Sequence, residues 1–366
     1  MDLHIIYYEK VITMQVIIPL AGEGTRMRPH THTKPKPLIE FAGKSCLSHI
    51  LDELKLFNDE QKKLLSEKKA DKNKIETISE VIFITGKLKE KIEEFVKKNY
   101  DFKSRFIEQK VKDGSAGAIK LAEPYVHEPV IIVYVDTLFE ADLSLINQLK
   151  NNEGGIIWVK EVEDYQRFGV CVLDNKGYIK KIIEKPKEPI SKLANIGLYY
   201  IKDSKLMFKG IKHLYDKKIT LKGEYYLVDA LSFMMDKGTN FICPSIEGWY
   251  DAGKPETLLE SHRALLKKNN RLIDTINSVI IPPVHLADGV KIKDSVVGPY
   301  VSISKGAEIT NSILRDCIIG ENAKISNILL ENSIIGAETV VDDNFKHLNI
   351  GDHCEISFAD KKKEEQ

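Results

Sequence analysis

The chain has 366 residues, of which 43% are hydrophobic and 30% charged, proportions typical of a globular protein large enough for two cores. Its 54 lysine and arginine residues balance its 54 aspartate and glutamate residues, which excludes a broad basic surface for nucleic acid or anionic lipid. No apolar run is long enough to span a membrane, so we expect neither nucleic acid nor a membrane as partner.

Residues 1–13 precede a second methionine, Met14, and a strongly apolar segment. They carry Glu9 and Lys10 and lack a small-residue cleavage site, so we expect an accessory N-terminal extension and no signal peptide. The five cysteines are odd in number and far apart, without a C-x-x-C pair. This pattern favours neither a disulfide framework nor a zinc site and predicts a cytoplasmic protein.

Strand and helix signals alternate along residues 14–270, which predicts an α/β domain with a mixed, doubly wound sheet. Gln15–Leu20 is the first apolar strand, and residues 47–57 carry apolar side chains at helical spacing. Asn58, with Gln61 three residues later, has the pattern of a helix N-terminus, so we expect a second helix there. The Lys- and Glu-rich stretch that follows predicts a solvated insertion before the next strand.

Two further apolar runs, Glu80–Thr85 and Val130–Val135, predict buried strands. A hairpin is expected over residues 170–183, around a turn that contains Asp174 and Gly177. Pro255 is well placed to open the last helix of this domain.

Residues 271–357 follow a different pattern, in which aliphatic residues recur six apart with a small residue between them. Copies begin at Val297, Ile319, Ile335 and, more weakly, Ile350. This is the hexapeptide pattern of a parallel β-helix, whose aliphatic side chains stack inward and whose corners favour glycine. Residues 358–366 are expected to be a charged tail.

A candidate phosphate-binding loop follows the first strand, with the sequence Leu20-Ala21-Gly22-Glu23-Gly24-Thr25-Arg26. Glycine lets backbone N–H groups approach an anion without a Cβ clash. The loop lacks the third glycine of a dinucleotide fingerprint and the Gly-Lys-Ser/Thr of a P-loop, which excludes both. Its proline-stiffened continuation adds Arg28, Lys34 and Lys36, so positive charge is concentrated here on an otherwise neutral protein. We therefore expect the loop to bind phosphates.

The loop and the Pro-Lys-Pro-Leu segment around Lys36 resemble the signature of the sugar-1-phosphate nucleotidylyltransferases, the family of glucose-1-phosphate thymidylyltransferase, UDP-glucose pyrophosphorylase and mannose-1-phosphate guanylyltransferase. The resemblance implies a Rossmann-like nucleotidyltransferase domain followed by a left-handed β-helix. It implies an enzyme (EC 2.7.7.-) that joins a nucleoside triphosphate, with UTP or dTTP favoured, to a sugar 1-phosphate and releases pyrophosphate. Mg²⁺ is the implied cofactor.

The same resemblance assigns roles residue by residue. Nucleotide binding falls on Leu20, Ala21, Gly22, Gly24, Thr25, Arg26, Gln109, Gly114 and Ser115. Sugar-phosphate binding falls on Gly169, Glu184, Lys185, Asn195 and Tyr199. Arg26, Lys36 and Lys185 are the catalytic cations, and Asp136 and Asp251 the magnesium ligands. The family commonly has glycine at the position of Val135 and threonine at the position of Lys254. The sequence around Gly114 also differs from the usual family motif, so the identity of the nucleotide base stays open.

Two alternatives remain beside this function. A catalytically silent regulatory subunit would bind nucleotide only, and a bifunctional enzyme would also transfer an acyl group in the β-helix, where His347 and His353 lie. All phosphate and metal candidates precede Lys254, so we expect the repeats to serve assembly and the protein to be a homo-oligomer.

Overall fold

The computed structural model describes residues 12–67, 75–266 and 275–343 and divides the chain into two units, Met1–Asn270 and Arg271–Gln366. The first strand begins at Ile12, so the expected extension over residues 1–13 reaches too far by two residues. The tail and the weak repeat at Ile350 lie outside the described residues. None of the helices in the described ranges has the length and apolar character needed to cross a membrane.

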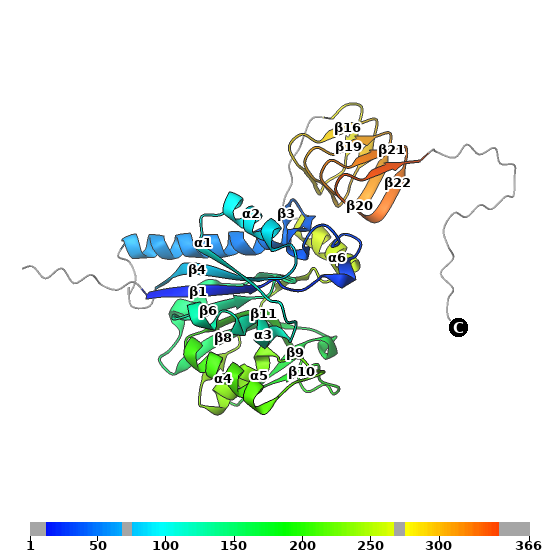
Figure 1. The fold of residues 1–366 in the computed structure, drawn as a ribbon. Helices are drawn as coiled ribbons and strands as arrows, with labels where there is room; N and C mark the ends of the chain where they lie inside the picture. The colour runs from blue at the N-terminus through cyan, green and yellow to red at the C-terminus, as the bar shows by residue number, and fades with distance from the viewer. Residues whose placement is uncertain (1–11, 68–74, 267–274, 344–366) are drawn as a thin grey trace, which may run out of the picture. The chain divides into compact units, whose positions relative to one another are not determined.

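A nine-stranded mixed sheet forms the centre of the first unit (Figure 1). Its strands are β1 (Ile12–Pro19), β4 (Glu76–Thr85), β5 (Ser104–Glu108), β6 (Val130–Val133), β8 (Glu153–Glu161), β9 (Gly169–Leu173), β10 (Ile179–Glu184), β11 (Leu193–Ile201) and β12 (Asn240–Ile242). The order is β10-β9-β11-β6-β1-β4-β5, with β8 joined to β11 and β12 to β8. β1 pairs in parallel with β4 and β6, whereas β11 is antiparallel to β6. The mixed sheet and the β9–β10 hairpin confirm the predicted fold class.

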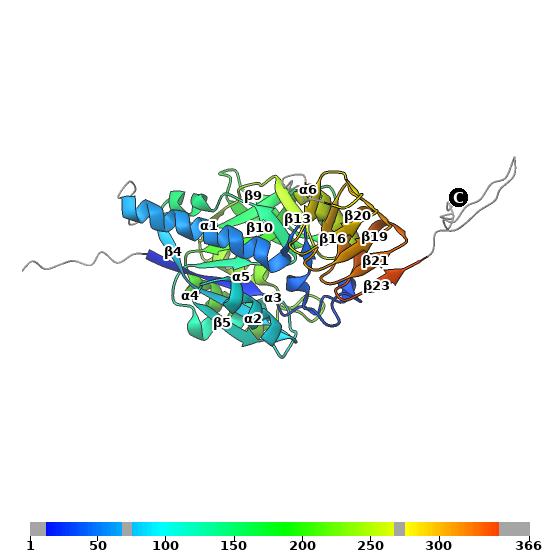
Figure 2. The same cartoon turned by 90° about the horizontal axis from the view of Figure 1, so that it is seen from above.

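Helices cover both faces of this sheet, as Figure 2 shows from above. They are α1 (Cys46–Glu67), α2 (Lys89–Asn99), α3 (Ser115–Lys120), α4 (Ser204–Lys217), α5 (Leu227–Asp236) and α6 (Pro255–Leu266). Ile17 and Ile82 pack in one core with α3, α4 and α5. Because side chains alternate along a strand, their buried neighbours Val16 and Val81 point to the opposite face, where α1 contacts β4.

The expected second helix at Asn58 is wrong, and the solvated insertion expected after it ends before Glu76; residues 68–74 of that insertion lie outside the described residues. α1 runs without a break from Cys46 to Glu67, and residues 76–79 already belong to β4. Asn58 and Gln61 are buried inside α1. The Asn58 side-chain oxygen accepts a hydrogen bond from Ile78 N at 2.8 Å, and Gln61 accepts one from Asn147 at 2.8 Å. Tertiary hydrogen bonds therefore satisfy residues whose local pattern favoured a cap.

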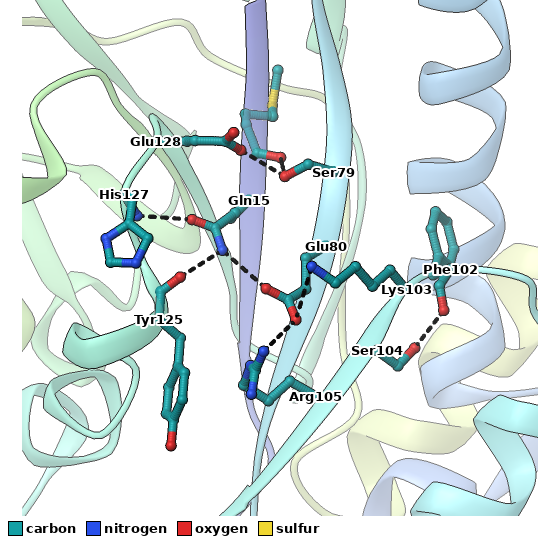
Figure 3. Close-up of polar contacts among 11 residues, drawn as sticks. Gln15, Ser79, Glu80, Phe102, Lys103, Ser104, Arg105, Tyr125, His127 and Glu128 are labelled. Carbon is teal, nitrogen blue, oxygen red and sulfur yellow. Dashed lines mark hydrogen bonds and ion pairs between the residues drawn. The ribbon is translucent and has the colours of Figure 1, made fainter.

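A buried polar network fixes the register of β1, β4 and β5 near the start of β1 (Figure 3). Gln15 donates to Glu80 at 3.1 Å and to the Tyr125 carbonyl at 2.8 Å. Arg105 pairs with Glu80, whose side chain is only 6% exposed, at 3.0 Å. Sliding either neighbouring strand by one residue would leave these groups unpaired in the core, which is costly.

Two short sheets complete the first unit. β2 (Glu40–Phe41) pairs with β3 (Lys44–Ser45) ahead of α1, and β7 (Thr137–Glu140) pairs antiparallel with β13 (Gly248–Asp251). The second pair joins segments that are separated in sequence by more than a hundred residues, about the length of a small domain. It therefore ties the end of β6 to the start of α6.

The second unit is a parallel β-helix, as the repeats predict. Its strands are β14 (Val279–Ile280), β15 (Val284–Leu286), β16 (Lys291–Lys293), β17 (Val296–Val297), β18 (Val301–Ile303), β19 (Glu308–Thr310), β20 (Ile313–Ile319), β21 (Lys324–Ser326), β22 (Leu329–Ile335) and β23 (Val340–Asp342). Corresponding strands of successive turns pair in parallel, such as β16-β19-β21-β23. Inward positions such as Val297, Leu314 and Ile325 are buried and form the core of this unit.

Candidate active site

A cleft of about 420 Å³ opens beyond the carboxyl ends of β1, β5 and β6. The chain leaves β1 for β4 on one side and returns to β6 on the other, so the strand order reverses at β1. Such a switch point leaves a crevice at the carboxyl ends of the strands, where ligands of open α/β sheets bind. Every residue expected to bind the nucleotide lines this cleft, together with Lys36 and Asp136.

The loop after β1 is held by glycine and by its own hydrogen bonds. Gly24 has φ 61° and ψ 32°, a left-handed conformation that costs glycine little. Its carbonyl accepts hydrogen bonds from Met27 N at 2.9 Å and from the Thr31 hydroxyl at 2.9 Å. A Cβ at Gly24 would lie 3.0 Å from Lys36 Cβ, so the glycine also lets Lys36 pack against the loop.

The segment between β5 and α3 forms another wall of the cleft. Gln109 is buried, and its backbone N–H donates to the Thr85 carbonyl at 2.8 Å. Its side-chain amide lies 3.4 Å from Asp113 and 3.5 Å from the Gly114 carbonyl. Tyr225 N donates to the Asp113 carbonyl at 2.8 Å, so residues ahead of α5 brace this segment.

The two expected metal ligands lie on neighbouring backbone segments. Asp251 ends β13, and the next residue, Ala252, donates its N–H to the Asp136 carbonyl at 3.0 Å. The Asp251 carboxylate accepts a hydrogen bond from Gly253 N at 2.6 Å and lies 3.4 Å from Arg167 Nη2. Among the described residues, the Asp136 carboxylate has no hydrogen-bond or ion-pair partner and lines the cleft, whereas Asp251 is not among the lining residues.

These donors suit a hard cation that shares its coordination with phosphates. The described part of the chain contains no group of three or more His, Cys, Asp or Glu side chains that could hold a metal. Mg²⁺ usually takes only one or two protein carboxylates and completes its shell with water and phosphate oxygens. Asp136 in the cleft lining, with Asp251 on the neighbouring backbone segment, therefore fits Mg²⁺ better than an ion that requires an all-protein cage.

The residues expected to bind the sugar phosphate form a second cluster, on β9, β10 and β11. Asn195 donates to the Gly169 carbonyl at 3.2 Å, and the Tyr199 hydroxyl donates to the Asn195 side chain at 2.5 Å. Lys185 Nζ lies 3.5 Å from the Glu184 carboxylate. None of these five residues lines the 420 Å³ cleft.

Tyr134 connects the cluster with the cleft. Its ring packs edge-on against the Tyr199 ring at 5.8 Å between centroids, and the residue lines the cleft. Burial raises the pKa of the Tyr134 hydroxyl, so this group is a neutral hydrogen-bonding side chain at neutral pH. The second cluster therefore borders the cleft across one aromatic side chain.

Burial also changes the acidity of the second cluster. It raises the pKa of Glu184, and the Lys185 ammonium counteracts this effect. Burial likewise raises the pKa of Asp229 in the first turn of α5, near Glu184. A desolvated carboxylate beside a cation is a strong acceptor for hydroxyl groups, and perturbed carboxyl groups of this kind gather at ligand sites.

Three residues at or near the cleft escaped the sequence analysis. Lys112 and Tyr134 line the cleft, and Arg167 pairs with Asp251. Lys112 lies beside the segment around Gly114, and Tyr134 lies near Asp136, but neither residue is part of the sequence motif that identified those positions. Arg167 contacts Asp251 only because the loop before β9 folds toward β13, and no local sequence pattern predicts this contact.

Comparisons with known proteins agree with this geometry. Residues 15–268 match the model of the nucleotidyl transferase family, and residues 262–357 match the model of a GlmU-like C-terminal hexapeptide region. The bifunctional protein GlmU of Methanocaldococcus jannaschii is 32% identical over 259 residues, which cover 70% of this chain and 55% of that protein. The chain thus spans about half the length of this relative.

A second relative is matched along nearly its whole length. The UTP–glucose-1-phosphate uridylyltransferase AglF of Haloferax volcanii is 28% identical over 268 residues, which cover 70% of this chain and 99% of that protein. The solved structure of a UDP-glucose pyrophosphorylase in complex with UDP-glucose has the same fold, with a TM-score of 0.57 at 22% identity, over 70% of this chain and 100% of that one. With the family model matched over residues 15–268, the chain belongs to the nucleotidyl transferase family.

Proposed function

We propose that this protein is a sugar-1-phosphate nucleotidylyltransferase that uses a nucleoside triphosphate, with UTP or dTTP favoured, and releases pyrophosphate. One observation carries the proposal. A single cleft at the strand-order switch gathers the phosphate-binding loop, the segment around Gln109, the cations Arg26 and Lys36 and the unpaired carboxylate of Asp136. The names of the relatives AglF and UDP-glucose pyrophosphorylase support the same reaction.

The reaction is an in-line displacement at the α-phosphorus of the triphosphate. A phosphate oxygen of the sugar 1-phosphate forms the new P–O bond, the bond from the α-phosphorus to the bridging oxygen breaks, and pyrophosphate leaves with that electron pair. Both reactants are anions, so catalysis consists mainly of positioning and charge neutralisation. A phosphate monoester is already ionised, so the chain needs no nucleophilic side chain and no general base.

We divide the work among this chain's residues as follows. Backbone N–H groups of the loop, with Arg26 and Lys36, hold the triphosphate and neutralise the leaving pyrophosphate. Lys185 holds the sugar phosphate from the second cluster, where Glu184 and Asn195 offer polar groups to the sugar. Asp136 and Asp251 would hold Mg²⁺, which when bound neutralises charge on the phosphates that meet between the two clusters.

The proposal is tested on the purified full chain. Pyrophosphate release should appear with at least one pairing of UTP, dTTP, GTP or ATP with a sugar 1-phosphate, vanish with a chelator and return with magnesium. Nucleotide binding without pyrophosphate release in every pairing would instead favour the silent regulatory subunit.

One observation favours a second activity in addition to the first. Residues 262–357 match the hexapeptide model named after GlmU, and the relative from M. jannaschii is called bifunctional. Acyl transfer in the β-helix therefore stays a candidate, and an acyl-CoA titration with free thiol release as readout tests it. No thiol release in the presence of amino-sugar phosphates would remove this candidate.

We also propose that the protein is a homo-oligomer assembled through the β-helix. Val279, Val296, Ile313 and Leu329 pair in register on successive turns and point outward on one face. Leu329 is 61% exposed and Val279 56%, so an apolar column faces solvent in the single chain. Leu329→Lys should lower the oligomeric mass measured by light scattering, whereas Lys324→Glu on the charged β21 face should not; an unchanged mass in both variants would contradict the assignment.

We place the reaction in the cytoplasm. Cys46, Cys171, Cys243 and Cys317 are free thiols in the described part of the chain, as is typical of proteins in reducing compartments. Cell fractionation with detection of the full chain tests this location.

A further inference from the structure

Lys112 reaches the phosphate-binding loop from the opposite wall of the cleft. It lies in the segment between β5 and α3, and its Nζ donates a hydrogen bond to the Ala21 carbonyl at 2.5 Å. Gly86, just beyond β4, leaves room for this contact. A Cβ at Gly86 would lie 2.8 Å from Ala21 O and 3.0 Å from Lys112 Nζ. The absence of a side chain at Gly86 therefore allows Lys112 to contact the loop.

The cleft has two chemically different ends. At one end, a Cβ at Gly253 would lie 3.3 Å from Arg26 Nη2, and Gly253 follows directly after the Asp251–Ala252 pairing with Asp136. Lys36 and Asp136 also line the cleft. This end combines cations with carboxylates and suits phosphates and a metal ion.

The other end is formed by Gln109, Lys112, Gly114 and Ala21. Lys112 contacts Ala21 directly, and Gln109 lies within hydrogen-bonding distance of Gly114. Glu224, which also lines the cleft, directly precedes Tyr225, whose N–H donates to the Asp113 carbonyl at 2.8 Å. Lys112 is the lysine that this segment, between β5 and α3, adds to the cleft lining.

The Lys112 ammonium has unused donors at this place. An ammonium carries three N–H groups and accepts no hydrogen bond, and the Ala21 carbonyl uses one of them. No carboxylate of the described residues lies within ion-pair distance of Nζ, and the side chain is exposed to solvent. The nearest acidic influences, Glu23 and Glu108, act on Lys112 only through space, while burial of part of the side chain lowers its pKa. Two N–H groups can therefore serve a ligand in the cleft.

We propose that Lys112 is a specificity-determining residue that donates a hydrogen bond to a carbonyl oxygen of the nucleotide base, and that it thereby favours uracil or thymine over adenine. This inference rests on the proposed function and names the group that selects its nucleotide. Uracil and thymine present O2 and O4 on either side of the N3–H donor, whereas adenine has no carbonyl oxygen and offers an amino group instead. An amino group meeting an ammonium would place two donors together, which leaves both unpaired.

Gln109 complements Lys112 in this selection. Its amide N–H groups face Asp113 and the Gly114 carbonyl, so its side-chain oxygen is the atom left over. An oxygen acceptor beside an ammonium donor matches an N3–H beside a carbonyl, which is the edge that uracil and thymine share. The pair therefore reads two adjacent atoms of one base edge.

Equilibrium binding of nucleotides to the full chain, without sugar phosphate, tests the proposal. We expect Lys112→Met, which keeps the length of the side chain, to weaken binding of UTP and dTTP about tenfold, because a hydrogen bond to a charged group contributes about this much. Binding of ATP should stay unchanged. The matched control is Lys87→Met: Lys87 is also close to Glu23, at 3.7 Å, but its side chain is 86% exposed and does not line the cleft.

Thio-substituted nucleotides test the contact in the wild-type chain, without depending on how the variant folds. Sulfur accepts hydrogen bonds poorly, so either 2-thio-UTP or 4-thio-UTP should bind the wild type more weakly than UTP, and Lys112→Met should abolish that difference. Equal weakening of UTP, dTTP and ATP by Lys112→Met would assign the lysine to the phosphates and overturn the proposal. The proposal would also be overturned if neither thio substitution changed the affinity of the wild type, or if Lys87→Met lost as much affinity as Lys112→Met. Because binding is measured without turnover, base selectivity without pyrophosphate release would refute the proposed function and leave this inference standing.

Discussion

Replacing Asp136 by asparagine separates a catalytic role from a structural one. The Asp136 carboxylate lines the cleft and has no hydrogen-bond or ion-pair partner among the described residues. Asparagine has the same shape and keeps one oxygen, so Asp136→Asn removes only the charge. We therefore expect the free energy of unfolding to change by less than about 0.5 kcal/mol, as is usual for substitutions outside a network of contacts.

The same substitution should be severe for turnover. If Asp136 holds the cation that neutralises the phosphates, loss of its charge should lower kcat about 10²-fold or more, equivalent to roughly 2.7 kcal/mol of transition-state stabilisation. Asp251→Asn should combine both effects. Its carboxylate accepts from Gly253 N at 2.6 Å and pairs with Arg167 at 3.4 Å, so the fold should also lose about 1 kcal/mol.

Two measurements on each variant decide this point: pyrophosphate release across a magnesium titration, and denaturant unfolding. Asp59→Asn is the matched control, because Asp59 is exposed on α1 and loses the same charge away from the cleft. Undiminished turnover in Asp136→Asn would refute the metal assignment. Equal loss of stability in Asp136→Asn and Asp251→Asn would refute the claim that only the second carboxylate is tied into the fold.

Three further predictions concern the loop, the division of the substrates and a buried acid. Lys185→Ala should raise KM for the sugar phosphate, whereas Lys36→Ala should lower kcat; steady-state kinetics that show the same loss of affinity for both substrates in both variants would contradict the division. Gly24→Ala should lower the free energy of unfolding by about 1–2 kcal/mol, measured by denaturant titration, because φ is 61° there. Burial raises the pKa of Glu76 above the ordinary 4.5, and the Tyr200 hydrogen bond only partly offsets this effect. The protonated form therefore stabilises the native state at low pH, and this contribution is lost as pH rises through the raised pKa. Melting temperatures should accordingly favour Glu76→Gln increasingly as the pH rises from about 4.5 through the raised pKa, and a difference independent of pH would show that Glu76 is not the group responsible.

Features with a strong local pattern could be predicted from the sequence. The candidate phosphate-binding loop has glycines and prolines that restrict or free their own backbone, and the β-helix shows a hexapeptide pattern that repeats along the sequence. The gathering of the nucleotide candidates at one cleft follows from their position after strands, because parallel strands end at the same edge of a sheet.

Features that depend on contacts between distant segments could not be predicted. Asn58 and Gln61 carry the pattern of a helix cap, but their partners Ile78 and Asn147 are remote in sequence, and these contacts keep α1 continuous. The contact between Lys112 and the Ala21 carbonyl arises in the same way, across 91 residues. In each case a polar side chain forms a hydrogen bond with a group that is distant in sequence and that lies close to it only in the folded protein.

Lys185 and Gly24 show that the two candidate substrate-binding clusters differ in backbone strain. Both residues have a left-handed φ, 48° at Lys185 and 61° at Gly24, but only Gly24 adopts it without a Cβ penalty. Lys185 N donates to the Phe168 carbonyl at 3.0 Å, so the β9–β10 hairpin holds the strained residue in place. Strain of this kind, of the order of 1–3 kcal/mol, persists where a side chain must point in a required direction.

Lys185→Gly should therefore raise the free energy of unfolding by up to about 1 kcal/mol while it weakens sugar-phosphate binding, whereas Lys185→Ala should weaken binding without that gain. Denaturant titration of both variants beside their sugar-phosphate KM is the measurement. If Lys185→Gly is no more stable than Lys185→Ala, the backbone at this position carries no strain, and the orientation of the ammonium is set by its side-chain contacts with Glu184 and the Tyr226 ring.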